Sequence, residues 1–383
     1  MICIENAKVV LEDGIIWDGV VLTDGDRIVE AGERGKVKVP DGAEHVDAGG
    51  AYVGPGFVDI HVHGGNGYLF DTEPEKAAEH FLAHGETSIL GTFYFDLTKE
   101  GYIEATDRLR EVTARQGAGK AIAGIYMEGP YMNPKYGSNP QKNKWRGDIK
   151  AEDYEEIVNC AGDLVKVWAI APERDGVEPF MAYAKKVNPR VCFAFGHCEA
   201  NAEQIRKLKK YGLKVQTHCM DATGVVTGCE GIRGNGPDEA CMADPELYAE
   251  LICDSLGIHV NSDNQRMILR NKGVDKVILI SDSNVDNDGI TSPDFGDVPD
   301  LTFDINGYLA GSKLTLDMCC RNIMHHTNCG IAQAFLMASR NPAKLIGIDD
   351  EVGTIEPGKR ANLVFVDDVF NVKRVMLEGK FVK

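Results

Sequence analysis

Short runs of strand-forming apolar residues alternate along the middle of the chain with longer segments whose apolar residues recur at helical spacing. Eight such runs occupy residues 56–62, 87–95, 121–127, 165–171, 190–195, 213–217, 257–260 and 276–280. Amphipathic segments, for example residues 74–84 and 202–211, lie between several of them. Because eight strand-then-helix units are what an α/β barrel of this class needs to close, the pattern predicts a (β/α)₈ TIM-like barrel over residues 53–350.

The two ends of the chain follow a different pattern. Residues 1–52 alternate short strand-forming runs with Asp-Gly turn dipeptides at 13–14 and 24–25, and residues 351–383 are built in the same way. Neither end shows helical periodicity. We therefore expect residues 1–52 and 351–383 to combine into one small β-sandwich beside the barrel.

A doubly wound parallel sheet is the other common way to arrange alternating strands and helices. That fold often carries a glycine-rich dinucleotide fingerprint after an early strand, and no such fingerprint is present in this sequence. The barrel is therefore the preferred interpretation.

The composition of the chain restricts which binding partners and which cellular compartment we expect. The chain has 59 Asp and Glu against 41 Lys and Arg, a formal net charge of −18, which disfavours nucleic acid and anionic membranes as partners. Its eleven cysteines are scattered, and the N-terminus lacks the pattern of a signal peptide. The apolar stretches are too short to span a bilayer. We expect a cytoplasmic protein with reduced thiols and no membrane partner.

Five of the eight apolar runs end in a histidine or a carboxylate. These strand ends carry His61, His63, Glu128, His197, His218 and Asp282. The C-terminal ends of barrel strands meet at one face, which is where the chemistry of such barrels is found. The pattern therefore predicts one site that contains all six side chains.

The residue types at these strand ends favour a metal site. His61 and His63, two residues apart on one strand, point to the same side and can bind one cation. Glu128 and Asp282 follow apolar runs, where an unpaired carboxylate would be costly to bury unless a cation were its partner. A single histidine at a strand end is more often a structural residue, but the joint arrangement favours Zn²⁺ or Fe²⁺.

Several longer motifs match a known family. They are PGFVDIHVHGG at residues 55–65, MEGPYMNP at 127–134, GHCEAN at 196–201, THCMDA at 217–222, LAGSKLTLD at 309–317 and the segment 341–367. With them the chain resembles the amidohydrolase superfamily and, within it, the N-acetylglucosamine-6-phosphate deacetylases. The resemblance extends over nearly the whole chain.

The resemblance implies roles for the predicted metal ligands. Glu128, His197 and His218 would bind the principal metal ion. His61 and His63 would build a second position, with Glu128 bridging the two. Members of this family hold one or two metal ions, so the cofactor expected here is one or two Zn²⁺ or Fe²⁺ per subunit.

The resemblance also assigns catalytic and substrate-binding residues. Asp282 would act as general base and then as general acid. His259 would contact the sugar or polarise the substrate carbonyl group, and Leu309, Ala310 and Gly311 would close over the acyl group. The resemblance further implies a homodimer.

Three positions on the substrate side depart from the family pattern. Asp221, which precedes Ala222, stands where the family has an asparagine that helps to bind the substrate phosphate. A carboxylate beside a phosphate dianion is repulsive. Arg233 is the candidate replacement for the family's phosphate-binding arginine, and Asn139 replaces a common histidine or glutamine.

These observations leave one leading hypothesis and three alternatives. The leading one is a metal-dependent deacetylase that converts N-acetylglucosamine 6-phosphate to glucosamine 6-phosphate and acetate. The first alternative is deacetylation of another N-acyl compound, because the departures concern the substrate and spare the metal site. The second is another amidohydrolase reaction such as cyclic amide opening, which the lack of a lysine at the end of residues 165–171 disfavours. The third is a non-catalytic sugar-binding barrel, which the presence of Asp282 disfavours.

Overall fold

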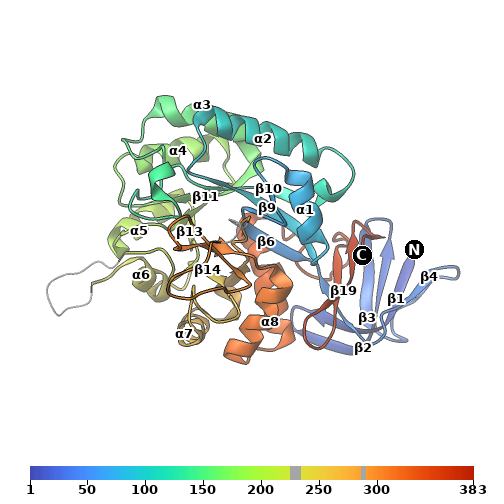
Figure 1. The fold of residues 1–383 in the computed structure, drawn as a ribbon. Helices are drawn as coiled ribbons and strands as arrows, with labels where there is room; N and C mark the ends of the chain where they lie inside the picture. The colour runs from blue at the N-terminus through green and yellow to red at the C-terminus, as the bar shows by residue number, and fades with distance from the viewer. Residues whose placement is uncertain (225–233, 286–289) are drawn as a thin grey trace.

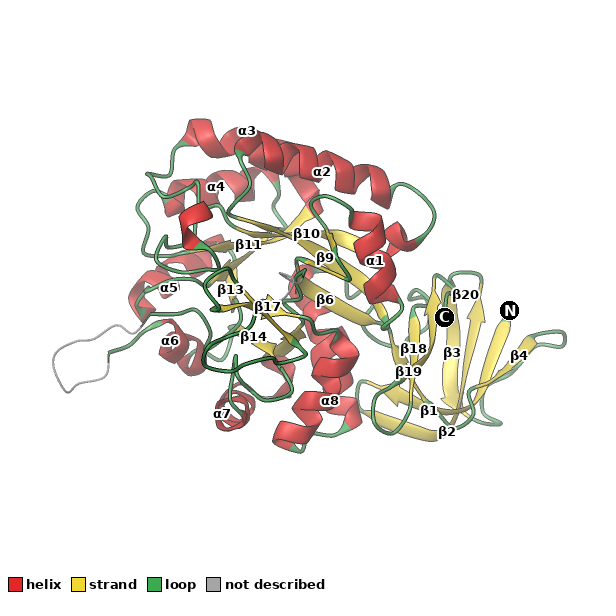
Figure 2. Cartoon of the chain, viewed as in Figure 1, coloured by secondary structure: helices red, strands yellow, loops and turns green. Residues whose placement is uncertain are grey.

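The chain folds into a large α/β body and a smaller all-β body that contains both chain ends (Figures 1 and 2). The computed structural model describes residues 1–224, 234–285 and 290–383. Arg233, the candidate phosphate-binding residue, lies outside the described residues.

The large body is a nearly closed barrel of eight parallel strands. In sheet order these are β6 (Phe57–Val62), β9 (Glu86–Tyr94), β10 (Ile122–Glu128), β11 (Val165–Ile170), β12 (Cys192–Phe195), β13 (Leu213–Gln216), β14 (Tyr248–Ile252) and β15 (Val277–Ile280). Backbone hydrogen bonds from Asp282 N to His61 O (3.0 Å) and from His63 N to Ser283 O (2.9 Å) join β15 to β6. The predicted TIM-like barrel is confirmed.

Barrel strands are buried on both faces, which explains their continuous apolar runs. All four residues of β15, Val277, Ile278, Leu279 and Ile280, are fully buried. A strand covered on both sides has no solvent face to alternate with, so its sequence shows no polar period. The chain therefore specifies these strands by short β-branched runs rather than by alternation.

Helices pack around the outside of the barrel. They are α1 (Pro74–Leu82), α2 (Lys99–Thr113), α3 (Ala151–Ala161), α4 (Val177–Val187), α5 (Ala202–Leu208), α6 (Pro237–Ala243), α7 (Ser262–Lys272), α8 (Leu316–Thr327), α9 (Ile331–Phe335) and α10 (Asn341–Ile346). In α1 the residues Pro74, Ala77, Ala78 and Phe81 are buried, the spacing of one helical face. Among the described residues, no helix is long and apolar enough to cross a bilayer.

The seventh strand is not where the sequence placed it. The predicted segment, residues 257–260, is a loop, and the strand is β14, Tyr248–Ile252. Glu250 hides this strand in the sequence, because a carboxylate in the middle of a short run breaks its apolar pattern. The loop is fixed by Asp254, whose carboxylate accepts hydrogen bonds from the backbone nitrogens of Ile258 and His259, both at 2.9 Å.

The smaller body is one sheet made from both ends of the chain. Its strand order is β20 (Lys380–Phe381), β19 (Val372–Leu377), β18 (Leu363–Val366), β5 (Tyr52–Pro55), β1 (Ile2–Leu11), β2 (Gly14–Asp24) and β3 (Arg27–Glu33), with β4 (Glu44–Asp47) also paired to β1. β18 and β5 pair antiparallel and join the two ends. The sheet encloses its own hydrophobic cluster, which includes Ile4, Val21, Val53, Leu363 and Met376. The predicted union of the chain ends is confirmed.

Two short hairpins lie beside the C-terminal ends of the barrel strands. One consists of β7 (Gly64–Gly65) and β8 (Tyr68–Leu69), directly after the first barrel strand. The other consists of β16 (Leu301–Phe303) and β17 (Leu309–Ser312). Ser312 N donates a hydrogen bond of 2.8 Å to Asp282 O, so the second hairpin lies against the end of β15.

Candidate metal and catalytic site

Two groups of potential metal ligands lie at the ends of the barrel strands and share one carboxylate. The first group is His61, His63 and Glu128, and the second is Glu128, His197 and His218. Within each group the ligand atoms lie within 4.8 Å of one another, and all five residues are buried. The structure therefore brings together five of the six side chains to which the sequence assigned metal binding, and the sixth, Asp282, lies 3.5 Å from His61 Nε2 and 3.4 Å from His63 Nε2.

The backbone at three strand ends is held in an unusual conformation. His197, His218 and Asp282, each shortly after a strand, have φ angles of 46°, 25° and 47°. Residues other than glycine rarely adopt this left-handed region, and each instance costs on the order of 1–3 kcal/mol. Strain of this kind persists only where the surrounding structure enforces it, and it is concentrated at functional sites.

The second ligand group is packed as a cation-binding set would be. His197 Nε2 and His218 Nε2 lie 2.9 Å apart, and both lie close to Glu128 Oε1, at 2.7 Å and 3.1 Å. Two imidazole nitrogens that converge on one carboxylate oxygen present their lone pairs to the same point in space. Imidazole and carboxylate donors of this kind suit Zn²⁺ or Fe²⁺.

The first ligand group contains a buried nitrogen that has no hydrogen-bond partner among the described residues. His61 Nε2 lies 3.5 Å from Glu128 Oε2 and 3.5 Å from Asp282 Oδ1, beyond hydrogen-bonding contact with either. His63 Nε2 lies 3.0 Å from Glu128 Oε2 and 3.4 Å from Asp282 Oδ1. Asp282 thus borders this group, and a cation between these atoms would satisfy the nitrogen of His61.

The carboxylate and the imidazoles of the site shift one another's pKa. Burial alone would raise the pKa of Glu128, but the charges of His61 and His197 hold it well below its usual range. Burial alone would lower the pKa of His63 and His218. Hydrogen bonds to Asp282 and Glu128 for His63, and to Glu128 for His218, outweigh burial and raise the pKa of each to about 9.

Metal binding should therefore release protons near neutral pH. With pKa values of about 9, His63 and His218 are protonated at pH 7.5 in the metal-free protein, and each must lose a proton to become a ligand. The apparent affinity for Zn²⁺ should fall as pH falls from 9, by up to about tenfold per pH unit for each proton released. Calorimetric titration at pH 7.5 in two buffers of different ionisation enthalpy measures the protons, and equal heats in both buffers would contradict this expectation.

His259 lies beside the site on the loop that follows β14. Its Nδ1 is 3.3 Å from Asp254 Oδ2, and its buried Nε2 has no hydrogen-bond partner among residues 1–224, 234–285 and 290–383. Burial would raise the pKa of Asp254, but the hydrogen bond from His259 and two backbone N–H groups lower it to about 2. Asp254 thus fixes the ring of His259 and leaves Nε2 available to a ligand.

A cavity of about 360 Å³ opens over the ligand groups. Its walls contain every described residue to which substrate binding was assigned, namely Asn139, Asp221, Ala222, His259, Leu309, Ala310 and Gly311. Lys142, one of several basic residues that follow the third strand in the sequence, also lines it. Tyr94 and Asn284 line it too and were not predicted from the sequence, because no periodic pattern marks them.

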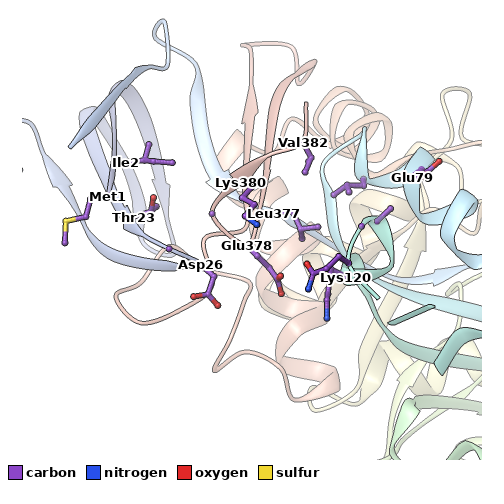
Figure 3. Close-up of a pocket in the computed structure, with 16 residues that line it drawn as sticks. Met1, Ile2, Thr23, Asp26, Glu79, Lys120, Leu377, Glu378, Lys380 and Val382 are labelled. Atoms are coloured by element: carbon purple, nitrogen blue, oxygen red, sulfur yellow. The ribbon is translucent and has the colours of Figure 1, made fainter. Parts of the chain in front are cut away.

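A larger cavity, of about 820 Å³, lies between the terminal sheet and the barrel, as Figure 3 shows. Thr23, Leu377 and Val382 line it from the sheet side, and Glu79 and Lys120 line it from the barrel side. None of the described residues in its walls belongs to a group of potential metal ligands. The convergent donors therefore distinguish the smaller cavity as the candidate site.

One carboxylate in direct contact with the ligand groups was not predicted from the sequence. Glu250, on the misplaced seventh strand, is fully buried, and its Oε2 lies 3.2 Å from His61 Nδ1. Placing β14 correctly would have revealed Glu250 as a carboxylate within a buried strand, the same signal that singled out Glu128.

Comparison with known proteins agrees with this geometry. The model of the amidohydrolase family matches residues 52–382, which includes all barrel strands and both ligand groups. The chain belongs to the amidohydrolase family.

Relatives of this amidohydrolase share its length and fold. It is 30% identical to N-acetylglucosamine-6-phosphate deacetylase of Bacillus subtilis, with 98% of this chain and 96% of the relative covered. It is 28% identical to N-acetylgalactosamine-6-phosphate deacetylase of Escherichia coli O157:H7, with 85% and 86% covered.

Solved structures give the same result. A Mycobacterium smegmatis N-acetyl-D-glucosamine-6-phosphate deacetylase mutant, in complex with N-acetyl-D-glucosamine-6-phosphate, matches with a TM-score of 0.84 at 26% identity, covering 100% of this amidohydrolase and 99% of that chain. The Pasteurella multocida N-acetylglucosamine-6-phosphate deacetylase has the same fold, with a TM-score of 0.87 at 24% identity and 99% of both chains covered.

Proposed function

We propose that this amidohydrolase removes the N-acetyl group from an amino sugar 6-phosphate, with N-acetylglucosamine 6-phosphate giving glucosamine 6-phosphate and acetate as the leading reaction. The observation that carries the proposal is the pair of ligand groups that share Glu128, with Asp282 beside them at the base of a cavity of about 360 Å³. Deacetylases of N-acetylated sugar 6-phosphates among the relatives support the substrate class.

The side chains divide the chemistry of amide hydrolysis among them. Glu128, His197 and His218 would hold one divalent cation, and His61 and His63 with Glu128 a second; a bound cation lowers the pKa of water and polarises a carbonyl group. Zn²⁺ and Fe²⁺ both suit these donors.

Asp282 is placed to move the proton. Burial alone would raise its pKa, but the hydrogen bond from His63 and the charge of His61 keep the pKa below its usual value, so Asp282 is a carboxylate at neutral pH. A carboxylate there accepts the proton of the attacking water and delivers it to the departing amine nitrogen. His259 Nε2 is free to contact the substrate carbonyl or a sugar hydroxyl.

The acyl side of the cavity is closed by β17. Gly311 has a φ of +88°, and a Cβ there would lie 2.6 Å from Asp282 O. Only glycine therefore lets this strand approach Asp282 so closely. Leu309 and Ala310, next to it, line the cavity where the small acetyl methyl group would lie.

A second candidate, an unphosphorylated N-acyl amino sugar, is favoured by one observation. Asp221 lines the cavity, and a carboxylate there repels a phosphate dianion. We further propose that the protein is a homodimer in the cytoplasm, on the basis of the family resemblance and of eleven scattered cysteines.

The substrate is identified by acetate release. N-acetylglucosamine, N-acetylgalactosamine and their 6-phosphates are compared, with Zn²⁺ or Fe²⁺ supplied and with metal removed by chelation. We expect acetate from a 6-phosphate only in the metal-loaded protein. Acetate from none of the four sugars in any metal state would overturn the proposed function, and a preference for an unphosphorylated sugar would favour the second candidate.

Asp221 should set the preference between the two kinds of substrate. Asp221→Asn is expected to lower KM for the 6-phosphate by about tenfold, since removing a repulsion of about 1.4 kcal/mol changes an equilibrium constant by that factor. The KM of the unphosphorylated sugar should stay within about twofold. Asp221 Oδ2 lies 3.8 Å from His218 Nδ1, so the metal content of the variant is measured alongside. An equal change in both KM values would contradict a role in phosphate discrimination.

A further inference from the structure

Glu250 contacts both ligand groups without belonging to either. Its Oε2 lies 3.2 Å from His61 Nδ1 in the first group and 3.3 Å from the backbone nitrogen of His218 in the second. The hydroxyl of Tyr126 donates to the same oxygen at 3.4 Å. One buried oxygen atom thus links two strand ends that carry different sets of ligands.

A role in packing alone does not explain a carboxylate at this position. Glu250 is fully buried, and its second oxygen, Oε1, has no hydrogen-bond partner in the part of the chain that the structure describes. Burying a charged group is unfavourable unless it is well paired, and an apolar side chain of the same size would avoid that cost. The contacts of its other oxygen with both ligand groups supply a reason for the carboxylate that packing does not.

The contacts of Glu250 determine how His61 presents its ring. A carboxylate only accepts hydrogen bonds, so the proton of a neutral His61 must lie on Nδ1, which leaves the lone pair on Nε2. That nitrogen faces Glu128 and Asp282, each 3.5 Å away. The ring of Tyr126 packs against the ring of His61, with centroids 4.3 Å apart and planes inclined by 30°, so the plane of the imidazole is held as well.

Tyr126 itself is held in place by a further residue. Its hydroxyl oxygen lies 2.8 Å from Oγ1 of Thr217, the residue directly before His218 in the sequence. Thr217 can donate to Tyr126 while Tyr126 donates to Glu250, which makes a continuous chain of hydrogen bonds from β13 to His61. Metal-ligating histidines are commonly oriented by a carboxylate on the nitrogen that does not bind the metal.

We propose that Glu250 is a positioning residue that fixes the tautomer and the plane of His61, and that the His61–His63–Glu128 group binds a divalent cation tightly only because of it. The inference rests on metal binding in the proposed function and is independent of which sugar is deacetylated.

Zinc titration of the metal-free protein tests the proposal without reference to activity. Wild type should bind two Zn²⁺ per chain in calorimetry, with the number checked by elemental analysis after dialysis. Glu250→Leu removes the acceptor and should weaken one of the two binding events by about 10–100-fold. Glu250→Gln keeps an acceptor but loses the charge, and should weaken the same event by about 3–10-fold.

Glu86→Gln provides a matched control. Glu86, the first residue of β9, is as deeply buried as Glu250, and one of its oxygens also has no hydrogen-bond partner within the described part of the chain. Its other oxygen accepts from Leu316 N rather than from a residue of the ligand groups. Both zinc affinities of this variant should stay within about threefold of wild type. A loss in Glu86→Gln equal to that in Glu250→Gln would show a general effect of replacing a buried glutamate, and would overturn the proposal.

A double-mutant cycle with His61 separates positioning from a merely structural role. In a His61→Ala background the Glu250 substitutions should change zinc binding by less than about threefold, because the residue through which Glu250 acts is gone. If Glu250→Leu does not fold, the same double-mutant cycle is carried out with Glu250→Gln, and its result tests the proposal.

Three results would overturn the proposal: a single zinc per wild-type chain, unchanged affinities in the Glu250 variants that fold, or an equal loss in both backgrounds. None of these results bears on acetate release, so they are distinguishable from a failure of the proposed function.

Discussion

Asp282→Asn is expected to lower kcat by about a thousandfold while the metal content of the protein stays nearly normal. The amide has the same shape as the carboxylate, but it cannot accept a proton from water or return one to the leaving nitrogen at neutral pH, and this transfer contributes on the order of 10²–10⁴ in rate. Asp282 lies at 3.4–3.5 Å from the histidines of one ligand group and is not needed to complete either group. Steady-state acetate release and elemental analysis of the same samples measure the two quantities.

Asp96→Asn is the control for this variant. Asp96 also lines the cavity but belongs to neither ligand group, so its substitution should change kcat by less than about tenfold. A loss of metal in Asp282→Asn, in parallel with the loss of kcat, would instead make Asp282 chiefly a ligand. Unchanged kcat with normal metal would exclude it as the general base.

The convergence of the proposed ligand residues was predictable because the barrel converts a local pattern into a spatial one. Glu128, His197 and His218 each stand at or just after the end of a barrel strand, and parallel strands bring such ends to one face. His197 and His218 thus converge on one oxygen of Glu128, although they lie 69 and 90 positions from it in the chain. No contact had to be known in advance, since the direction of the strands alone determines the meeting point.

The seventh strand and its glutamate follow the same rule but violate its sequence signature. Glu250 interrupts an apolar run with a charge that is acceptable only because His61, Tyr126 and His218 N surround it. Those partners lie on or just after three other strands, so nothing within residues 248–252 indicates that a charge can be buried there. Residues 257–260, a short run that contains glycine, fitted the apolar pattern better, so the strand was predicted there, and that prediction was wrong.

The identity of several residues that line the substrate side of the cavity was predictable, but their positions in space were not. Loops shape it, and loops take their positions from individual contacts, such as the one from Asn139 N to Asp304 Oδ2 at 3.4 Å. Asp304 in turn binds the backbone of Asn306 and Tyr308 within the second hairpin. Since such contacts have no period in the sequence, the resemblance to a family supplied these residues and their positions did not follow from the pattern.

Glu128→Gln should abolish metal binding at both positions and lower kcat by more than about a thousandfold. Both ligand groups contain this residue, so its loss leaves each with two imidazoles, which is fewer than the three protein ligands of a typical catalytic zinc site. Metal catalysis is worth several kcal/mol of the barrier, or about three powers of ten. Elemental analysis after dialysis should find less than about 0.1 Zn²⁺ per chain.

His63→Ala is the comparison for Glu128→Gln, because His63 belongs to only one ligand group whereas Glu128 belongs to both. It removes one member of the first group and leaves Glu128, His197 and His218 intact, so about one Zn²⁺ per chain should remain. Glu128→Gln should still fold without metal, because the substitution removes a buried charge, and thermal unfolding of the two metal-free variants checks this. If folded Glu128→Gln retained one tightly bound Zn²⁺, one group would bind metal without Glu128, and the bridging role would be wrong.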